Sequence, residues 1–158
     1  RPAVHLQRVA VGDRQPARVD DAVKNYIPRL PPVWRFRVDI IPTARRVKSD
    51  RSRRARDDES AVILDKTAAD FLVLLDERGR SLTSLDLARR LDDWQQDGRD
   101  LSFVVGGPDG VTDAVRQRAD FCWSLSALTL PHGLARILCV EQLYRAWSLN
   151  AGHPYHRS

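Results

Sequence analysis

The segment LSFVVGGPDGVTD, residues 101–113, decides the fold class of this chain. Its first part, LSFVV at 101–105, is an almost continuous apolar run, which is typical of a strand buried on both faces of a parallel sheet. The sequence GGPDG at 106–110 then predicts a tight turn, and Thr112 suits the start of a helix at 113–120. Ligands of open α/β sheets bind outside the carboxyl ends of such strands. The turn has neither GxGxxG spacing nor the lysine of a P-loop, so a simple connection and a ligand contact both stay open.

Strand and helix patterns continue to alternate on both sides of this segment. They predict strands at 4–11, 34–41, 71–75 and 124–130, and helices at 17–30, 84–97 and 134–149. Within 34–41 the residues expected to face the core are Trp34, Phe36, Val38 and Ile40, which alternate with Arg35, Arg37 and Asp39. Strands that alternate with helices predict an α/β fold with a mainly parallel sheet.

The chain has 158 residues, the size of one domain with its own hydrophobic core. It contains no run of 18 apolar residues and no apolar segment typical of a secretory signal, so neither a membrane span nor a signal peptide is expected. Its two cysteines, Cys122 and Cys139, form no CxxC motif or Cys/His cluster with zinc spacing, so no metal site is expected. Two free thiols favour a reducing compartment such as the cytoplasm, and Cys139 in ILCV is expected in the core.

The charge of the chain is unevenly distributed. The formal net charge is +5, and residues 1–60 carry 15 Lys/Arg against 8 Asp/Glu, whereas residues 61–158 carry 11 against 13. Positions 45–56 alone hold seven basic residues and one acid. Such a basic half indicates an anionic partner, nucleic acid above all, or else a solvated surface in an arginine-rich proteome. For 45–56 the two interpretations are a mobile loop leading into a helix and a phosphate-contacting surface, and they are compatible.

Two C-terminal segments carry chemistry of their own. In LSALTLPHG, residues 125–133, and just before it, Ser124, Ser126 and Thr129 suit side-chain turns, and His132 suits a capping or packing position before a helix. The tail GHPYHRS, residues 152–158, combines histidines, a tyrosine and an arginine. It is either a frayed terminus or a surface that stacks on an unpaired base and pairs with phosphate.

Several motifs, taken in order, resemble one known family. They are VAVG at 9–12, LDERG at 75–79, WQQDGRDLSFVVGGPDG at 94–110, WSLSALTLPH at 123–132 and YRAWSLNAGHPYHRS at 144–158. Together they resemble the bacterial 23S rRNA pseudouridine methyltransferase family (RlmH) of the SPOUT class, over nearly the whole chain. The resemblance implies a single SPOUT domain over residues 1–158, with a mainly parallel sheet, helices on both faces and a C-terminal trefoil knot.

The resemblance also implies an activity and its residues. A homodimer would transfer a methyl group from S-adenosyl-L-methionine to N3 of a pseudouridine in 23S rRNA of the assembled ribosome, without a metal. The family's cofactor-binding positions match Leu75, Gly107, Ser126, Ala127, Leu128, Thr129, Leu130 and Pro131. Its catalytic, substrate-side positions match Arg145, Tyr155, His156 and Arg157. A general base for the N3 proton stays open among His132, Glu141 and His156.

Two alternatives follow from the same residues. A non-catalytic ribosome- or RNA-binding protein that has kept the fold would not bind S-adenosyl-L-methionine. A small-molecule methyltransferase or other nucleotide-binding enzyme would not need the basic half or the tail. The stretch 45–56 is richer in arginine than the family leads one to expect, which indicates either stronger rRNA contact or a GC-rich genome.

Overall fold

A computed structural model describes all residues except 1–3, 13–16, 43–48, 108 and 158. Its centre is a five-stranded sheet in the order β2-β1-β4-β3-β5, in which every neighbouring pair is parallel. The strands are β1 (Leu6–Val11), β2 (Arg37–Ile41), β3 (Phe71–Ser81), β4 (Leu101–Val105) and β5 (Phe121–Ser124). The predicted α/β fold with a parallel sheet is confirmed.

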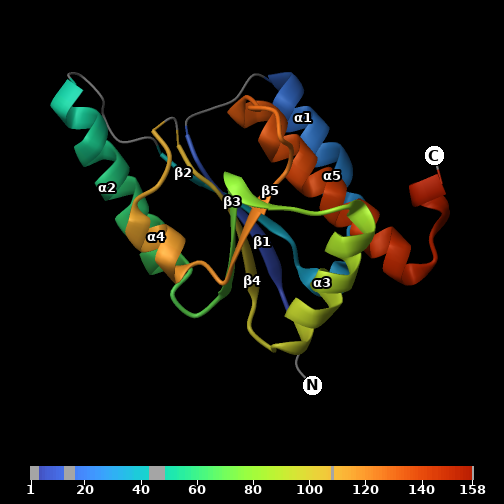
Figure 1. Cartoon of the computed structure of the whole chain (residues 1–158). Helices are drawn as coiled ribbons and strands as arrows, with labels where there is room; N and C mark the ends of the chain where they lie inside the picture. Colours follow the sequence, from blue (N-terminus) through green and yellow to red (C-terminus); the bar gives the residue numbers. More distant parts are fainter. Residues whose placement is uncertain (1–3, 13–16, 43–48, 108, 158) are drawn as a thin grey trace.

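Helices cover both faces of the sheet (Figure 1). On one side lie α1 (Ala17–Tyr26), α3 (Ser84–Gln96) and α5 (His132–Ala151), and on the other α2 (Ser49–Lys66) and α4 (Asp113–Arg118). The described residues also form three short 3-10 helices, η1 (Ile27–Arg29), η2 (Pro32–Trp34) and η3 (Pro154–Arg157). The first part of the basic stretch, 45–48, lies outside the described residues, whereas 49–56 belongs to α2 and is therefore helical instead of a loop.

Each face of the sheet has its own hydrophobic cluster. Phe103 of β4 packs with α3 and α5, while Val104 of the same strand packs with α2 and α4 on the opposite side. Every residue of β4 is buried, as the run LSFVV predicts. Cys139 is fully buried in the first cluster, which confirms its predicted place in the core.

The second strand differs from its prediction. Trp34 lies in η2, and Arg35 adopts a left-handed conformation (φ 47°), which separates the 3-10 turn from the strand. The alternation predicted over 34–41 is therefore interrupted, and β2 begins only at Arg37. Ile40 is 43% exposed, and its neighbour Ile41 is buried instead, because β2 is an edge strand whose inner face meets the second cluster.

The strand predicted at 124–130 is wrong in position: β5 ends at Ser124. Beyond it the backbone turns, because the Ser124 hydroxyl donates to the Ser126 carbonyl (2.9 Å) and the Ser126 hydroxyl accepts from the Leu128 amide (2.9 Å). These local side-chain bonds replace the ladder that a strand requires. The tail, expected to be irregular, forms η3 after Gly152 ends α5 in a left-handed conformation (φ 71°).

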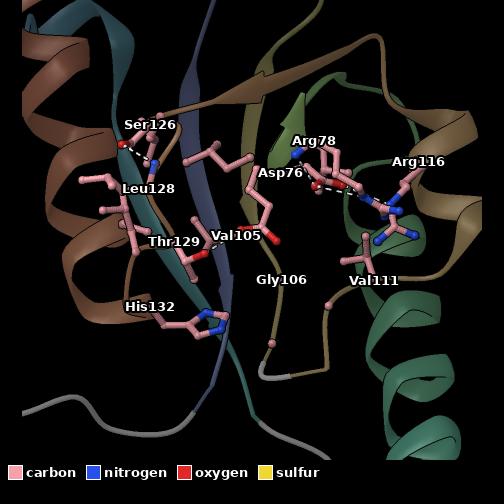
Figure 2. Close-up of a pocket in the computed structure, with 18 residues that line it drawn as sticks. Asp76, Arg78, Val105, Gly106, Val111, Arg116, Ser126, Leu128, Thr129 and His132 are labelled. Carbon is pink, nitrogen blue, oxygen red and sulfur yellow. Dashed lines mark hydrogen bonds and ion pairs between the residues drawn. The ribbon is translucent and has the colours of Figure 1, made fainter. Parts of the chain in front are cut away.

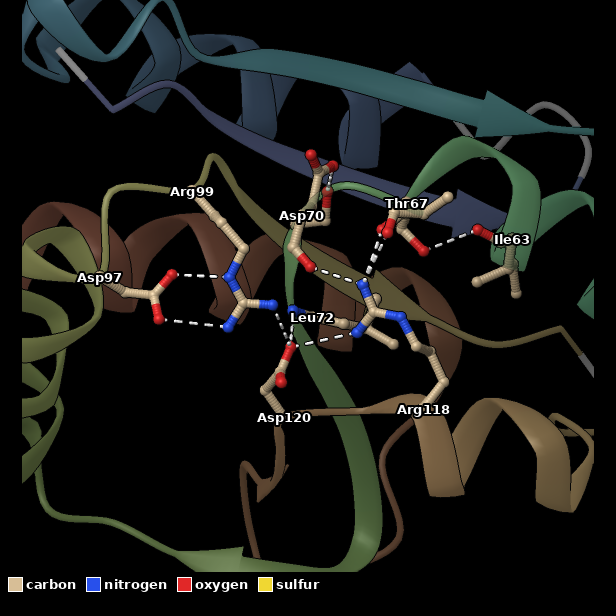
Figure 3. Close-up of polar contacts among 10 residues, drawn as sticks. Ile63, Thr67, Asp70, Leu72, Asp97, Arg99, Arg118 and Asp120 are labelled. Atoms are coloured by element: carbon tan, nitrogen blue, oxygen red, sulfur yellow. Dashed lines mark hydrogen bonds and ion pairs between the residues drawn. The ribbon is translucent and has the colours of Figure 1, made fainter. Parts of the chain in front are cut away.

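A polar network fixes the amino ends of the strands (Figure 3). Arg118, at the end of α4, donates to the carbonyls of Thr67 (3.0 Å) and Asp70 (2.6 Å) and to the carboxylate of Asp120 (3.1 Å). Asp120 also accepts from the Leu72 amide (2.9 Å), and Arg99 approaches it to 3.6 Å. The network joins α2, β3 and α4 at the amino ends of the strands. The candidate functional site lies at the other end of the sheet.

The replacement Arg118→Ala is expected to lower the free energy of unfolding by about 2 kcal/mol, since it leaves partly buried carbonyls without a donor. Arg99→Ala is the matched control, because Arg99 pairs mainly with the neighbouring Asp97 (2.6 Å) at the surface, and should change stability by less than about 1 kcal/mol. Chemical denaturation measures both. Equal losses in the two variants would contradict a special role of Arg118.

Candidate active site

A cavity of about 420 Å³ opens at the carboxyl end of β4, beside the middle of the longer strand β3 (Figure 2). The middle of β3 contributes Leu75 and Asp76, β4 contributes its last residue Val105, and the turn after β4 contributes Gly106 and Gly107. The third wall is the loop at 125–130, which precedes α5. Three separate segments thus converge where ligands of parallel α/β sheets bind.

The glycine turn is held against the helix α2. Gly107 accepts from the Gly110 amide (3.0 Å), which closes the turn. A β-carbon on Gly107 would lie 2.8 Å from Oε1 of Glu59 and 3.0 Å from Cγ1 of Val11, so only glycine fits without displacement. The Ser60 hydroxyl accepts from the Thr112 amide (3.0 Å) just beyond the turn. These contacts give the turn a fixed position at the cavity floor.

The wall formed by β3 depends on a break in its pairing with β5. Leu75 pairs with Trp123, and Arg80 pairs with Trp123 as well, so residues 76–79 bulge out of the ladder. At Gly79 a β-carbon would lie 2.7 Å from the Cys122 carbonyl carbon and 2.8 Å from the Trp123 amide nitrogen. The bulge turns Asp76, Glu77 and Arg78 toward the cavity, which all three line.

Asp76 is the centre of the charged side of the cavity (Figure 2). Its Oδ2 accepts from Nε of Arg116 (3.0 Å), and its Oδ1 accepts from the Arg78 amide (3.0 Å). Burial by itself raises the pKa of this carboxyl, but the hydrogen bonds from Arg78 and Arg116 and their charges lower it below its usual value. Asp76 is therefore an anion at neutral pH, matched by two cations.

The opposite wall is apolar and weakly polar. Leu128 is 73% exposed, and Leu130 is half-buried beside it. The Thr129 hydroxyl donates to Oε2 of Glu77 (3.2 Å), which joins this wall to the β3 bulge. Burial and then the charge of Arg136 lower the pKa of His132, and its hydrogen bond with the Gly106 backbone opposes them. His132 is therefore neutral at pH 7 and ties α5 to the glycine turn.

The structure brings most of the predicted cofactor residues together. Six of the eight line the cavity: Leu75, Gly107, Ser126, Leu128, Thr129 and Leu130. Ala127 and Pro131 belong to the same loop but are exposed and do not line it. Arg116, Glu77 and Arg78 also line the cavity and were not predicted to do so, because no helix or strand pattern shows that a bulge and a helix will share one wall.

The predicted substrate-side residues form a second group at the far end of α5. Arg145 donates to Glu141 (3.2 Å) and lies over the Tyr155 ring (5.1 Å). Burial raises the pKa of the Tyr155 phenol, whose hydroxyl also contacts Tyr26 (3.3 Å). Nδ1 of His156 lies 3.4 Å from the Ser148 hydroxyl, and Arg157 is exposed.

The two groups do not meet within one chain. The helix α5 has 20 residues, and its first residue lines the cavity while its last precedes the tail. At 1.5 Å per residue the helix spans about 30 Å. A single copy therefore holds the cavity and the aromatic, cationic tail at opposite ends of α5.

Two buried arginines, one in β1 and one in α5, were not predicted from the sequence. Arg8 and Arg136 are 2% and 1% exposed, and burial lowers the pKa of both. Nη1 of Arg8 donates to the Arg136 carbonyl (3.1 Å), and Nη2 of Arg136 donates to the Val11 carbonyl (3.1 Å). These bonds fasten the first turns of α5, and with them one end of the cavity wall, to β1.

The fold is that of an α/β protein with a cavity outside the carboxyl end of β4, the place where ligands of such sheets bind. A family model described as a predicted SPOUT methyltransferase matches residues 4–156. The chain belongs to this family of SPOUT methyltransferases, as the sequence motifs predict. The trefoil knot that the resemblance implies stays a prediction.

Curated relatives share nearly the full length of the chain. The protein named ribosomal RNA large subunit methyltransferase H from Thioalkalivibrio sulfidiphilus is 50% identical over 155 residues, which are 98% of each chain. Its counterpart from Methylibium petroleiphilum is 45% identical over 153 residues, 96% of this chain and 98% of the relative. Both identities are high enough to place this chain in the same family as these two proteins.

Solved structures with low sequence identity share the fold. A probable methylase family protein from Haemophilus influenzae has a TM-score of 0.59 at 10% identity, over 97% of this chain and 70% of that one. A putative methylase family protein from Neisseria gonorrhoeae has a TM-score of 0.57 at 12% identity, over 90% of this chain and 82% of that one.

Within the described residues, no helix is long and apolar enough to cross a membrane, and no three His, Cys, Asp or Glu side chains group as metal ligands.

Proposed function

We propose that this protein methylates large-subunit ribosomal RNA with S-adenosyl-L-methionine as the methyl donor. The acceptor that the RlmH resemblance implies is N3 of a pseudouridine in 23S rRNA of the assembled ribosome, and the setting is the bacterial cytoplasm. The observation that carries the proposal is the 50% identity, over 98% of the chain, to a protein named for this activity on ribosomal RNA.

The cavity fits the proposed donor. Its volume of about 420 Å³ lies within the range of small-molecule sites, which is roughly 300–1,000 Å³. Leu75, Val105, Leu128 and Leu130 give apolar walls for an adenine ring, and the backbone of the 126–131 loop and of Gly107 offers hydrogen bonds. The carboxylates of Asp76 and Glu77 suit a ligand that carries a positive charge. Leu75, Gly107 and the 126–131 loop are therefore the residues that would hold it.

When bound, the donor supplies a methyl group already activated by its sulfonium, so the chain's own task is to align the acceptor and remove a proton. The His132 ring lines the cavity, is neutral at pH 7 and bonds the Gly106 backbone through one nitrogen, which leaves the other as a proton acceptor. Glu141 and His156 lie instead with the tail. Both the cavity and the tail therefore offer a proton acceptor.

A homodimer would unite the cavity and the tail. Because about 30 Å of helix separates them within one chain, the tail can serve a cavity only if that cavity belongs to a second copy. In this arrangement Arg157 and Arg145 hold phosphate, Tyr155 stacks on a base, and His156 lies beside them. The cavity of the partner then supplies the donor.

Two measurements test the proposed function. Calorimetry should detect S-adenosyl-L-methionine binding to the purified protein, and mass spectrometry of rRNA from a strain lacking the gene should show the loss of one methyl group, restored by the wild-type gene. A non-catalytic RNA-binding protein with this fold predicts neither result. Absence of both would therefore favour that alternative.

The basic helix α2 yields a prediction about rRNA contact. Arg53 and Arg54 are exposed on α2, and each phosphate contact contributes about one unit to the salt dependence of binding. We expect Arg53→Gln/Arg54→Gln to reduce the slope of log K against log salt for ribosomal subunits by about two, with donor affinity unchanged. Arg89→Gln on α3 is the matched exposed control. An unchanged slope in the double variant would show that this part of α2 contacts no phosphate.

A further inference from the structure

We propose that Glu77 makes the cavity select by charge between the methyl donor and its demethylated product. The inference rests on the proposed function, because it concerns the ligand of the same cavity. The donor carries a sulfonium cation, whereas the product S-adenosyl-L-homocysteine carries a neutral thioether. An anion without a cationic partner at the cavity would favour the first ligand over the second.

The two carboxylates of the cavity are not equivalent. Asp76 has a 13% exposed side chain, and it pairs with Arg116 (3.0 Å) and Arg78 (3.6 Å). Its charge is therefore matched inside the protein. Glu77 forms no ion pair with any arginine, lysine or histidine in the described part of the chain, and its one hydrogen bond there comes from the neutral Thr129 hydroxyl (3.2 Å). Glu77 is the carboxylate whose charge a cationic ligand would balance.

The position of Glu77 directs this charge toward the ligand. Glu77 belongs to the β3 bulge, and its bond to Thr129 reaches the loop at 125–130, which also lines the cavity. The nearby cations Arg116 and Arg78 also line the cavity but pair with other carboxylates: Arg116 bonds Asp76 and Asp113 (3.2 Å), and Arg78 lies 3.6 Å from Asp76. His132 adds no positive charge at pH 7, because burial lowers its pKa. No cation of the described residues pairs directly with the Glu77 carboxylate, so this charge stays available to a cationic ligand in the cavity.

The expected size of the effect is moderate, because Glu77 is exposed to solvent. A unit charge pair at contact distance in such a partly solvated place changes affinity roughly fivefold to tenfold. The ligand loses its positive charge when it gives up the methyl group. The cavity therefore binds the product less tightly than the donor, which promotes product release.

Calorimetry on the full-length protein tests the inference with three ligands. They are S-adenosyl-L-methionine, S-adenosyl-L-homocysteine and sinefungin, in which an amine-bearing carbon replaces the sulfonium. Glu77→Gln should weaken both cationic ligands about fivefold to tenfold and the neutral product less than twofold, and the difference should shrink as salt is raised. Circular dichroism and thermal unfolding verify that the variant is folded.

Two control variants separate charge from shape. Thr129→Val removes the hydrogen bond but keeps the carboxylate, so it should leave the ratio of the donor and product affinities unchanged. Asp113→Asn removes a carboxylate that is 90% exposed and lies outside the cavity, and should also leave the ratio unchanged. An equal loss for all three ligands in Glu77→Gln, or no loss, would overturn the inference while the proposed function stands. Failure of the wild-type protein to bind any of them would overturn the proposed function itself.

Discussion

The replacement Arg157→Ala is expected to reduce rRNA methylation about 100-fold or more and to leave the dissociation constant for S-adenosyl-L-methionine within twofold of the wild-type value. Arg157 is exposed at the end of η3. The cavity lies at the other end of the 20-residue helix α5. The Arg157 guanidinium in the tail can bind a phosphate of the RNA through two parallel hydrogen bonds. Its loss removes the alignment of the acceptor and leaves the donor site unchanged.

Tyr155 needs a subtler pair of variants, because it also packs in the fold. Its ring lies 4.5 Å from that of Tyr144, and its hydroxyl contacts Tyr26 (3.3 Å). Tyr155→Ala should abolish methylation with a measurable loss of stability, whereas Tyr155→Phe keeps the ring and should retain most of the activity if stacking is the role of Tyr155. Single-turnover methylation, donor calorimetry and thermal unfolding separate these effects. Arg89→Ala is the control for loss of an exposed arginine, and wild-type turnover in Arg157→Ala would exclude a substrate role for the tail.

Mixed dimers test whether the tail serves the partner's cavity. An Arg157→Ala chain can be combined with a chain whose cavity is filled by Leu130→Trp, at a residue that lines it. If the site is composite, one cavity of the mixed dimer is served by an intact tail, and activity should return from near zero to a fraction of the wild-type value. If each tail serves its own cavity, the mixture stays inactive, because no chain has both parts.

Local sequence patterns were sufficient wherever one periodicity or one apolar run determines a structure. The run 101–105 is buried on both sides because β4 is an inner strand, and the stripe Leu87, Leu91 and Trp94 is the buried face of α3. Thr83 caps this helix through a reciprocal bond with Asp86. In such cases the local preference and the tertiary environment agree, so the fold class follows from the sequence.

Local patterns failed where tertiary contacts or polar side chains decide the backbone. Ser124 and Ser126 turn the chain out of β5, although the segment after them is apolar enough for a strand. The ion pair of Asp76 and Arg116 joins residues that are 40 positions apart, and no sequence periodicity predicts it. The resemblance to a family identified six residues that line the cavity, but not the distance between cavity and tail, since motif order carries no information on separation in space.

Gly79→Ala is expected to destabilise the protein by about 3 kcal/mol or more and to weaken donor binding at least tenfold. The methyl group would lie 2.7 Å from the carbonyl carbon and oxygen of Cys122, and 2.8 Å from the Trp123 nitrogen. These are backbone atoms of β5, which cannot move aside as the end of a flexible side chain can. The ladder between β3 and β5 must then separate where the bulge carries Asp76 and Glu77.

The matched control is Gly98→Ala, which adds the same methyl group two residues after the end of α3, away from the bulge of β3. Gly98 has a left-handed backbone (φ 94°) but no atom within 4 Å of the added carbon, so only conformational strain of about 1–2 kcal/mol is expected, with donor binding unchanged. Denaturation and calorimetry on both variants therefore separate a general glycine effect from damage to the cavity wall. If Gly79→Ala bound the donor as the wild type does, the 76–79 bulge would not shape the site. The close approach of β3 to β5 predicts the opposite, because one methyl group there displaces the carboxylates of the cavity together with the strand that carries them.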